Sequence, residues 1–175
     1  MARLKLVRYP NPTLRAPNFE VAFPLSRETR ELVDQMMYSC KRFHGIGLAA
    51  PQIGYNLNLA VINLEEYQIP PFAILNPKII SSSSKSHTME EGCLSIPGKF
   101  GSLKRPEKVT VKFITIEGKE MKLSVDGLLA VVFQHEIDHL GGVLICDKWD
   151  INTVHTLDES ELARARKKRK KQTTR

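Results

Sequence analysis

The chain has 175 residues, which lies within the usual size range of a single domain. Its hydrophobic fraction of 42% and charged fraction of 26% are typical of a globular protein, and no apolar run approaches the roughly 18 residues of a membrane span. The formal net charge is +7, but residues 164–175 carry eight basic side chains and no acidic one, which leaves −1 for residues 1–163. We therefore expect one folded domain over residues 1–163, followed by a basic tail over residues 164–175.

The cysteine content and the first residues indicate the compartment. The three cysteines, Cys40, Cys93 and Cys146, are too few and too widely spaced for a disulfide framework, which is typical of a reducing compartment. Basic residues interrupt the first ten positions, so these positions hold no apolar signal-peptide core. We expect a cytoplasmic protein without membrane attachment, which a bacterium, an organelle or a phage could each encode.

The first half of the chain predicts an irregular segment, one helix and two strands. Four prolines within residues 7–24 favour an extended and irregular backbone. A helix is expected from Ser26, a suitable N-cap, to about Phe43, because apolar residues recur between them at helical spacing. Strand-like stretches follow at 57–63 and 72–80.

The second half predicts a hairpin and then a helix. Residues 108–113 alternate polar and apolar side chains, and a turn at 117–119 leads into a second strand that ends near Ser124. A helix is expected directly after Ser124, with Asp126 in its first turn, and it should run to about Leu140.

The end of the chain completes the predicted fold. The paired glycines Gly141 and Gly142 end the preceding helix, and residues 142–146 are expected to form a short strand. A third, C-terminal helix begins near Asp158 and continues into the basic tail. The order of elements predicts an α+β fold, a compact single domain in which mixed, mostly antiparallel strands pack around the helix that ends at Leu140.

That helix carries the sequence His135-Glu136-Ile137-Asp138-His139. Two histidines four residues apart lie on the same helix face and can bind one cation, while Glu136 can accept a proton from a water on that cation. The alternative is a solvent-exposed face with two ordinary histidines. The histidines instead continue an apolar stripe from Leu128 through Val131 or Val132, and buried imidazoles need partners. A metal site is therefore favoured.

A catalytic metal needs a third protein ligand and one position left for water. Downstream candidates are His155, Glu159 and Glu161, and the upstream candidate is Cys93 within Glu-Gly-Cys-Leu-Ser. A lone cysteine commonly packs as a small apolar residue. From these residues alone, both Cys93 and Glu159 stay open.

Residues 45–52, Gly-Ile-Gly-Leu-Ala-Ala-Pro-Gln, superficially match a dinucleotide-binding loop. Such a loop follows a strand and opens a long helix, whereas here a predicted helix precedes it and Pro51 with Gly54 disfavours a following one. We therefore exclude nucleotide binding.

Three stretches taken together resemble the peptide deformylases. That family shows G-x-G-x-A-A-x-Q, E-G-C-L-S and H-E-x-D-H in this order, and the chain carries all three intact at 45–52, 91–95 and 135–139. The resemblance extends over about residues 4–150. The chain departs from the family at Phe100, where many relatives carry an arginine. This difference bears on how tightly the peptide residues after the methionine bind.

The resemblance implies a role for each matching residue. The metal ligands would be Cys93, His135 and His139, Glu136 would be the general base and then the general acid, and Gln52 with the backbone N–H of Leu94 would stabilise the oxyanion. The remaining residues would bind substrate or steady its loop: Gly45, Ile46, Gly47, Glu91, Leu128, Val131 and Val132. The expected ion is Fe²⁺, with Zn²⁺, Ni²⁺ or Co²⁺ also compatible with a Cys/His/His ligand set.

The implied reaction is hydrolytic removal of the N-formyl group from the initiator methionine of nascent polypeptides, by a metal-bound hydroxide with release of formate. A first alternative is a zinc-type metallopeptidase with a downstream glutamate as its third ligand. A second is a non-enzymatic RNA-binding module that acts through the basic tail. Independently of these, the tail predicts ribosome association through salt-dependent contacts with RNA phosphates.

Overall fold

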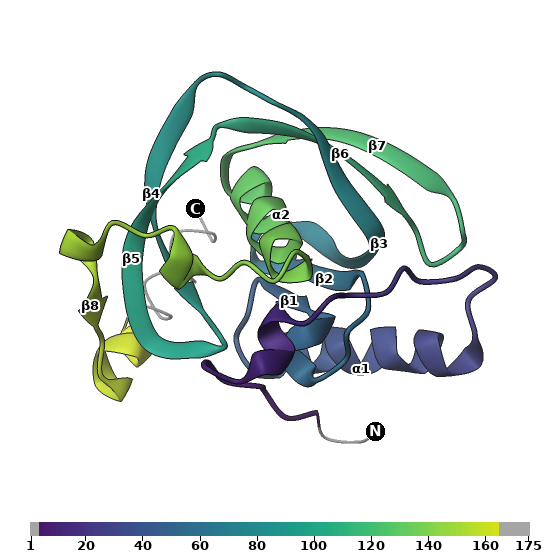
Figure 1. Cartoon of the computed structure of the whole chain (residues 1–175), viewed down its shortest axis with the longest axis horizontal. Helices are drawn as coiled ribbons and strands as arrows, with labels where there is room; N and C mark the ends of the chain where they lie inside the picture. The colour runs from purple at the N-terminus through teal and green to yellow at the C-terminus, as the bar shows by residue number, and fades with distance from the viewer. Residues whose placement is uncertain (1–3, 165–175) are drawn as a thin grey trace.

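Two antiparallel sheets hold one helix between them in the computed structural model, which describes residues 4–164 (Figure 1). One sheet has the strand order β1-β2-β3-β6-β7, formed by Gly47–Ala49, Leu59–Leu64, Ile69–Ser82, Lys108–Ile114 and Glu120–Asp126. The other has the order β4-β5-β8, formed by Ser86–Cys93, Ile96–Pro106 and His155–Thr156. The helices are α1, Arg27–Arg42, and α2, Gly127–Leu140, with short 3-10 helices η1 to η5 at Pro12–Arg15, Ala50–Ile53, Glu65–Tyr67, Ile145–Asp147 and Ile151–Thr153. The predicted α+β class is confirmed.

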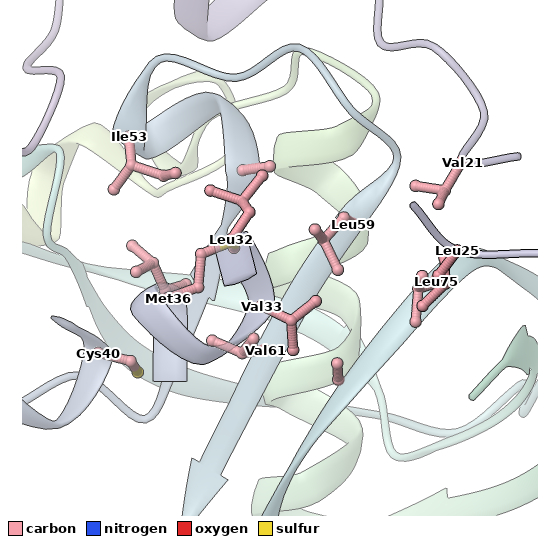
Figure 2. Close-up of a cluster of buried hydrophobic side chains, with 13 residues drawn as sticks. Val21, Leu25, Leu32, Val33, Met36, Cys40, Ile53, Leu59, Val61 and Leu75 are labelled. Atoms are coloured by element: carbon pink, nitrogen blue, oxygen red, sulfur yellow. The ribbon is translucent and has the colours of Figure 1, made fainter. Parts of the chain in front are cut away.

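Helix α1 begins where the sequence predicts. The Ser26 side chain accepts a hydrogen bond from the backbone N–H of Thr29 at 3.2 Å, which satisfies one of the free donors of the first turn. Its apolar side chains gather on one face and pack against the five-stranded sheet, as Figure 2 shows for Leu32, Val33 and Met36. Each buried side chain of this size contributes about 1.5–3 kcal/mol to folding.

Strand β2 is buried on both faces, because helices cover both sides of its sheet. Leu59 and Val61 belong to the cluster beside α1 (Figure 2), while Ala60 and Ile62 belong to the cluster that contains α2. This follows from the alternation of side chains along a strand. On the α2 side of this sheet, the polar residues Gln134, Glu136 and His139 of the helix are buried.

Helix α2 is anchored by aromatic packing. The fully buried Phe133 ring lies 6.1 Å from the Phe72 ring and 5.9 Å from the Phe113 ring, both on the five-stranded sheet. Asp126, expected in the first turn, is instead the N-cap residue directly before it, and its side chain makes no capping hydrogen bond. At the other end the N–H of Gly141 bonds to the carbonyl of Ile137, so the helix stops where the glycines predict.

The prediction of a strand at 142–146 is wrong. The segment contains a turn and the 3-10 helix η4 instead, because the Asp147 carboxylate accepts a hydrogen bond from the N–H of Leu144 at 2.9 Å and bends the backbone. Leu144 and Ile145 still bury their side chains, in a third cluster that also contains Leu14 and Cys93. The apolar residues at 142–146 therefore indicated that the segment is buried, and did not indicate a strand.

The chain after α2 returns to the β4-β5 sheet, where β8 pairs with the edge of β5 (Figure 1). Residues 159–164 are helical, so the predicted C-terminal helix is confirmed, whereas residues 165–175 of the basic tail lie outside the described residues. Within residues 4–164, no helix combines the length and the apolar character needed to cross a membrane.

Candidate active site

Helix α2 and the end of strand β4 bring three ligand side chains together. His135 and His139 are one helical turn apart, with ring centroids separated by 5.0 Å. Cys93 closes β4 directly opposite, and its Sγ lies 3.2 Å from His139 Nε2. One ligand atom from each of the three residues lies within 4.8 Å of the other two.

This cluster fits a divalent transition metal. Ligands about 2.0–2.3 Å from a tetrahedral ion lie about 3.5 Å from one another, which is close to the observed spacing. A thiolate with two imidazoles suits zinc, iron(II), cobalt or nickel. In addition, the buried Glu136 Oε2 beside the cluster has no hydrogen-bond partner among the described residues. A buried oxygen of this kind indicates a place for a water, ion or substrate.

The electrostatics of the site favour a thiolate and a carboxyl group that titrates near neutrality. Burial would raise the pKa of Cys93, but attraction to His139 and hydrogen bonding with both histidines outweigh burial and lower it well below its ordinary value. Burial raises the pKa of Glu136 to about 7, although both histidines oppose this shift. A group with this pKa can accept and return a proton at neutral pH.

The orientation of His135 depends on a buried ion-pair network. Its Nδ1 lies 3.0 Å from Glu91 Oε2, which leaves Nε2 for the ligand cluster. Arg105 donates to both Glu91 oxygens and, at 2.9 Å, to Asp138 Oδ2. Burial would raise the pKa of Glu91, but the bonds to His135 and Arg105 lower it to about 2, so the carboxylate stays ionised. Hydrogen-bonded carboxylates of this kind fix the ring orientation of metal-binding histidines.

Gln52 is held with its amide group toward Cys93. It lies in η2 and is almost fully buried. Its Oε1 accepts from the N–H of Ala49 at 2.8 Å, and its Nε2 lies 3.5 Å from Cys93 Sγ and 3.3 Å from Ser95 Oγ. The bond to Ala49 therefore decides which end of the amide faces the site, and that end is the donor.

A cavity of about 650 Å³ connects these groups. Twelve of the thirteen site residues predicted from the sequence line its walls: Gly45, Ile46, Gly47, Gln52, Glu91, Cys93, Leu94, Leu128, Val131, Val132, His135 and Glu136. The thirteenth, His139, is 1% exposed and is not among the residues that line the cavity. Within residues 4–164 the metal-ligand cluster does not include Glu159, Glu161 or His155.

Some contributors to the site do not stand out in the sequence. Asp138, Ser95 and Lys148 carry no predicted role, yet Asp138 joins Arg105 to Lys148, whose Nζ lies 2.7 Å away, and Ser95 contacts Gln52. The signal for Asp138 is its place inside H-E-x-D-H. The ion pair between Arg105 and Asp138 joins residues 33 positions apart, so no local sequence pattern could predict it.

Comparison with known proteins identifies the family. The model of the polypeptide deformylase family matches residues 3–154. The chain belongs to this family. It is 43% identical over 150 residues to the peptide deformylase of Hydrogenovibrio crunogenus, covering 84% of this chain and 86% of that protein. The predicted membership is confirmed, and the chain is a deformylating hydrolase.

Solved deformylase structures share the fold. The peptide deformylase of Synechococcus elongatus, in complex with actinonin, superposes with a TM-score of 0.80 at 40% identity, covering 94% of this chain and 86% of that chain. That of Thermotoga maritima also gives a TM-score of 0.80, at 30% identity, covering 86% of this chain and 99% of that chain.

Proposed function

We propose that this protein removes the formyl group from N-formyl-methionyl peptides, with Cys93, His135 and His139 as metal ligands and Glu136 as the proton carrier. The observation that carries the proposal is the buried Glu136 carboxyl, whose Oε2 has no hydrogen-bond partner among the described residues, beside three ligand atoms within 4.8 Å of one another. The alternative peptidase has less support, because Glu159 is not in the ligand cluster of the described residues.

The metal, when bound, lowers the pKa of a water molecule toward neutrality and polarises the formyl carbonyl. We expect Fe²⁺ to be the physiological ion, since the family resemblance implies it. Zn²⁺, Ni²⁺ and Co²⁺ are compatible with the same donors. Glu91 and Arg105 hold His135 in its orientation for this purpose.

Glu136 and Gln52 carry out the remaining steps. Glu136 accepts the proton of the attacking water at Oε2, the oxygen that has no hydrogen-bond partner among the described residues, and then returns the proton to the departing amine. Gln52 donates its amide hydrogen to the formyl oxygen as negative charge develops, and the N–H of Leu94 joins it. Each such donor contributes about 3 kcal/mol of transition-state stabilisation.

The peptide would bind along β1. This strand is at the end of the sheet order, so one of its edges pairs with no other strand within residues 4–164, and an extended peptide could pair with that edge. Gly45 and Gly47 would allow close approach of the peptide backbone. Ile46, Leu128, Val131 and Val132 would surround the methionine side chain, because they form the apolar part of the cavity.

The first test is formate release from formyl-Met-Ala-Ser, with protein purified without oxygen and reloaded with iron(II). The expected products are formate and intact Met-Ala-Ser. Cleavage of the Met-Ala bond without formate would instead support the metallopeptidase alternative.

The third ligand is tested by metal content. Cys93→Ser should lose most of the bound iron, because a hydroxyl is a poor ligand for this set, whereas Glu159→Ala should keep it. The opposite pattern would overturn the assignment of Cys93.

Ribosome association through residues 164–175 stays a prediction. It rests on the charge of the tail, and all of the tail beyond Arg164 lies outside the described residues. Unchanged co-sedimentation with ribosomes at low salt after deletion of the tail would contradict it.

A further inference from the structure

The two oxyanion donors of the proposed reaction come from different sheets. Gln52 lies in η2, directly after β1 of the five-stranded sheet, whereas Leu94 lies in the turn between β4 and β5 of the other sheet. The Gln52 amide reaches across to Ser95 Oγ at 3.3 Å and to Cys93 Sγ at 3.5 Å. The contact with Ser95 is longer than the usual N–H···O distance of about 2.9 Å. These side-chain contacts alone would fix the spacing of the two donors only loosely.

Residues 6–9, here called the N-terminal strap, bond to both segments. The backbone N–H of Val7 donates to the carbonyl of Gln52 at 2.8 Å, and that of Tyr9 donates to the carbonyl of Ser95 at 2.9 Å. Both bonds have the ordinary length of a strong backbone hydrogen bond. The strap, in dark purple, runs beside the turn that follows β4 (Figure 1). It therefore joins the residue that carries one donor to the neighbour of the residue that carries the other.

The side chains of the strap show that it is extended. Leu6 and Arg8 line the cavity, whereas Val7 packs against the apolar cluster that contains Cys93. Such alternation is typical of an extended backbone, in which residues two apart direct their N–H groups to the same side. The Cα atoms of residues 7 and 9 are then about 7 Å apart. Their two N–H groups hold the carbonyls of Gln52 and Ser95 at a matching separation.

We propose that the N-terminal strap positions the oxyanion donors, by holding Gln52 and Leu94 at the separation at which both reach the formyl oxygen. This inference rests on the proposed function. Val7 and Tyr9 are positioning residues that act through their backbone N–H groups, and neither touches the reacting atoms. Oxyanion donors stabilise the transition state only when they are held in place beforehand, so a loosened strap should lower kcat.

The first test removes one N–H of the strap. Val7→Pro deletes the donor to Gln52, because proline has no backbone N–H. We expect kcat for formyl-Met-Ala-Ser to fall by roughly tenfold, a part of the 10²–10³-fold cost of losing a whole donor. KM should stay within about twofold of the wild-type value, and the bound iron should be unchanged, since no metal ligand bonds to Val7.

Lys5→Pro is the matched control. It places a proline in the same N-terminal segment, at an exposed residue whose N–H has no hydrogen-bond partner among residues 4–164. It should keep the wild-type kcat. Replacement of Val7 by α-hydroxyvaline removes the same N–H without a ring, and this variant decides the question if Val7→Pro does not fold or loses its iron.

A double-mutant cycle separates positioning from general destabilisation. In a Gln52→Ala enzyme, Val7→Pro should lower kcat less than twofold further, because the donor that it places is already absent. Tyr9→Pro acts on the segment of Leu94, so it should still lower kcat in that enzyme. A purely structural defect would instead lower kcat by the same factor whether or not Gln52 is present.

Three results would overturn the inference. Wild-type kcat in the variants that lack the Val7 N–H would overturn the strap and leave the proposed function standing. An equal loss of kcat from Val7→Pro with and without Gln52 would do the same. Absence of formate from the iron-loaded wild type would overturn the proposed function, and the role of the strap with it.

Discussion

Gly47 and Glu136 lie so close together that position 47 leaves room for a hydrogen atom and no larger group. A Cβ there would lie 2.1 Å from Glu136 Oε1 and 2.6 Å from its Cδ. Carbon and oxygen atoms in contact are normally separated by more than 3 Å, about the range of the van der Waals minimum. The glycine therefore limits where the carboxylate can lie, and a methyl group would displace it.

We expect Gly47→Ala to lower kcat for deformylation by about 100-fold, because a shift of about 1 Å in a reacting group costs about that much. Steady-state formate release with matched metal content measures the effect. Gly141→Ala is the control, since its Cβ would meet its nearest neighbour, the carbonyl oxygen of Asp138, at an ordinary 3.4 Å. Equal kcat for the two variants would contradict the close packing of Gly47 against Glu136.

The β4-β5 hairpin positions the cysteine and the carboxylate that steadies His135, yet its strands are not evident in the sequence. Inward positions of a strand are normally apolar, whereas this hairpin places Glu91 and Arg105 inside. Gly92 and Gly101 further weaken the strand pattern, since they make room for the Phe100 and Trp149 rings. The residues that build the site are therefore the ones that conceal the strands.

Other elements follow directly from sequence. Ser26 and the apolar spacing after it predict α1, and the alternation at 108–113 predicts β6 with its hairpin partner β7. The three motifs likewise predict the cluster of Cys93, His135 and His139, which the fold brings together. Spacing alone could not decide whether Cys93 or Glu159 is the third metal ligand. Cys93 lies 42 residues upstream of His135, so only the tertiary structure brings the two together.

The ion pair between Arg105 and Glu91 should strengthen metal binding, because Glu91 orients the ligand His135. We expect Arg105→Lys to weaken iron(II) affinity by roughly tenfold or more, because a lysine cannot form the two-pronged bond that holds Glu91 against His135. Competition with a chelator measures the affinity. Lys104→Arg, an exposed neighbour on the same strand, is the matched control. Arg105→Lys with wild-type affinity would show that Glu91 needs no such support.

Across the whole molecule, the N-terminal segment is tied to the loop after α2. Arg15 makes two bonds to the Asp147 carboxylate, at 2.8 Å and 2.7 Å, and a third to the carbonyl of Gly142 at 3.1 Å. Asn18 also donates to the carbonyl of Leu140 at 2.7 Å. These contacts join residues more than 120 positions apart and tie the N-terminal segment to the end of α2 and the loop that follows it.

The hydrogen bond and charge of Arg15 lower the pKa of Asp147 from 3.8 to about 2. Because the folded-state pKa is the lower one, this stabilisation is complete above about pH 4 and disappears as the pH falls through about 2. The shift corresponds to about 2.5 kcal/mol, which solvent screening at this half-exposed pair reduces to about 1 kcal/mol.

We therefore expect Asp147→Asn to lower the free energy of unfolding at pH 7 by about 1 kcal/mol, with a smaller difference from wild type as the pH falls from 4 toward 2. Urea denaturation at several pH values measures this difference. Glu31→Gln, which breaks the exposed pair with Arg27, should change stability by only about 0.3 kcal/mol. A difference at Asp147 that stays constant down to pH 2 would exclude the carboxylate charge as its cause.

The central claim is that Glu136 moves the proton while Cys93, His135 and His139 hold the metal. The most direct measurement is bound iron and formate release in one sample of Glu136→Gln, which keeps the shape of the side chain and removes its basicity. We expect one ion per chain, as in the wild type, with kcat lowered by about 10²–10⁴-fold. Formate release at the wild-type rate with the metal still bound would contradict the account, because another group would then have to carry the proton.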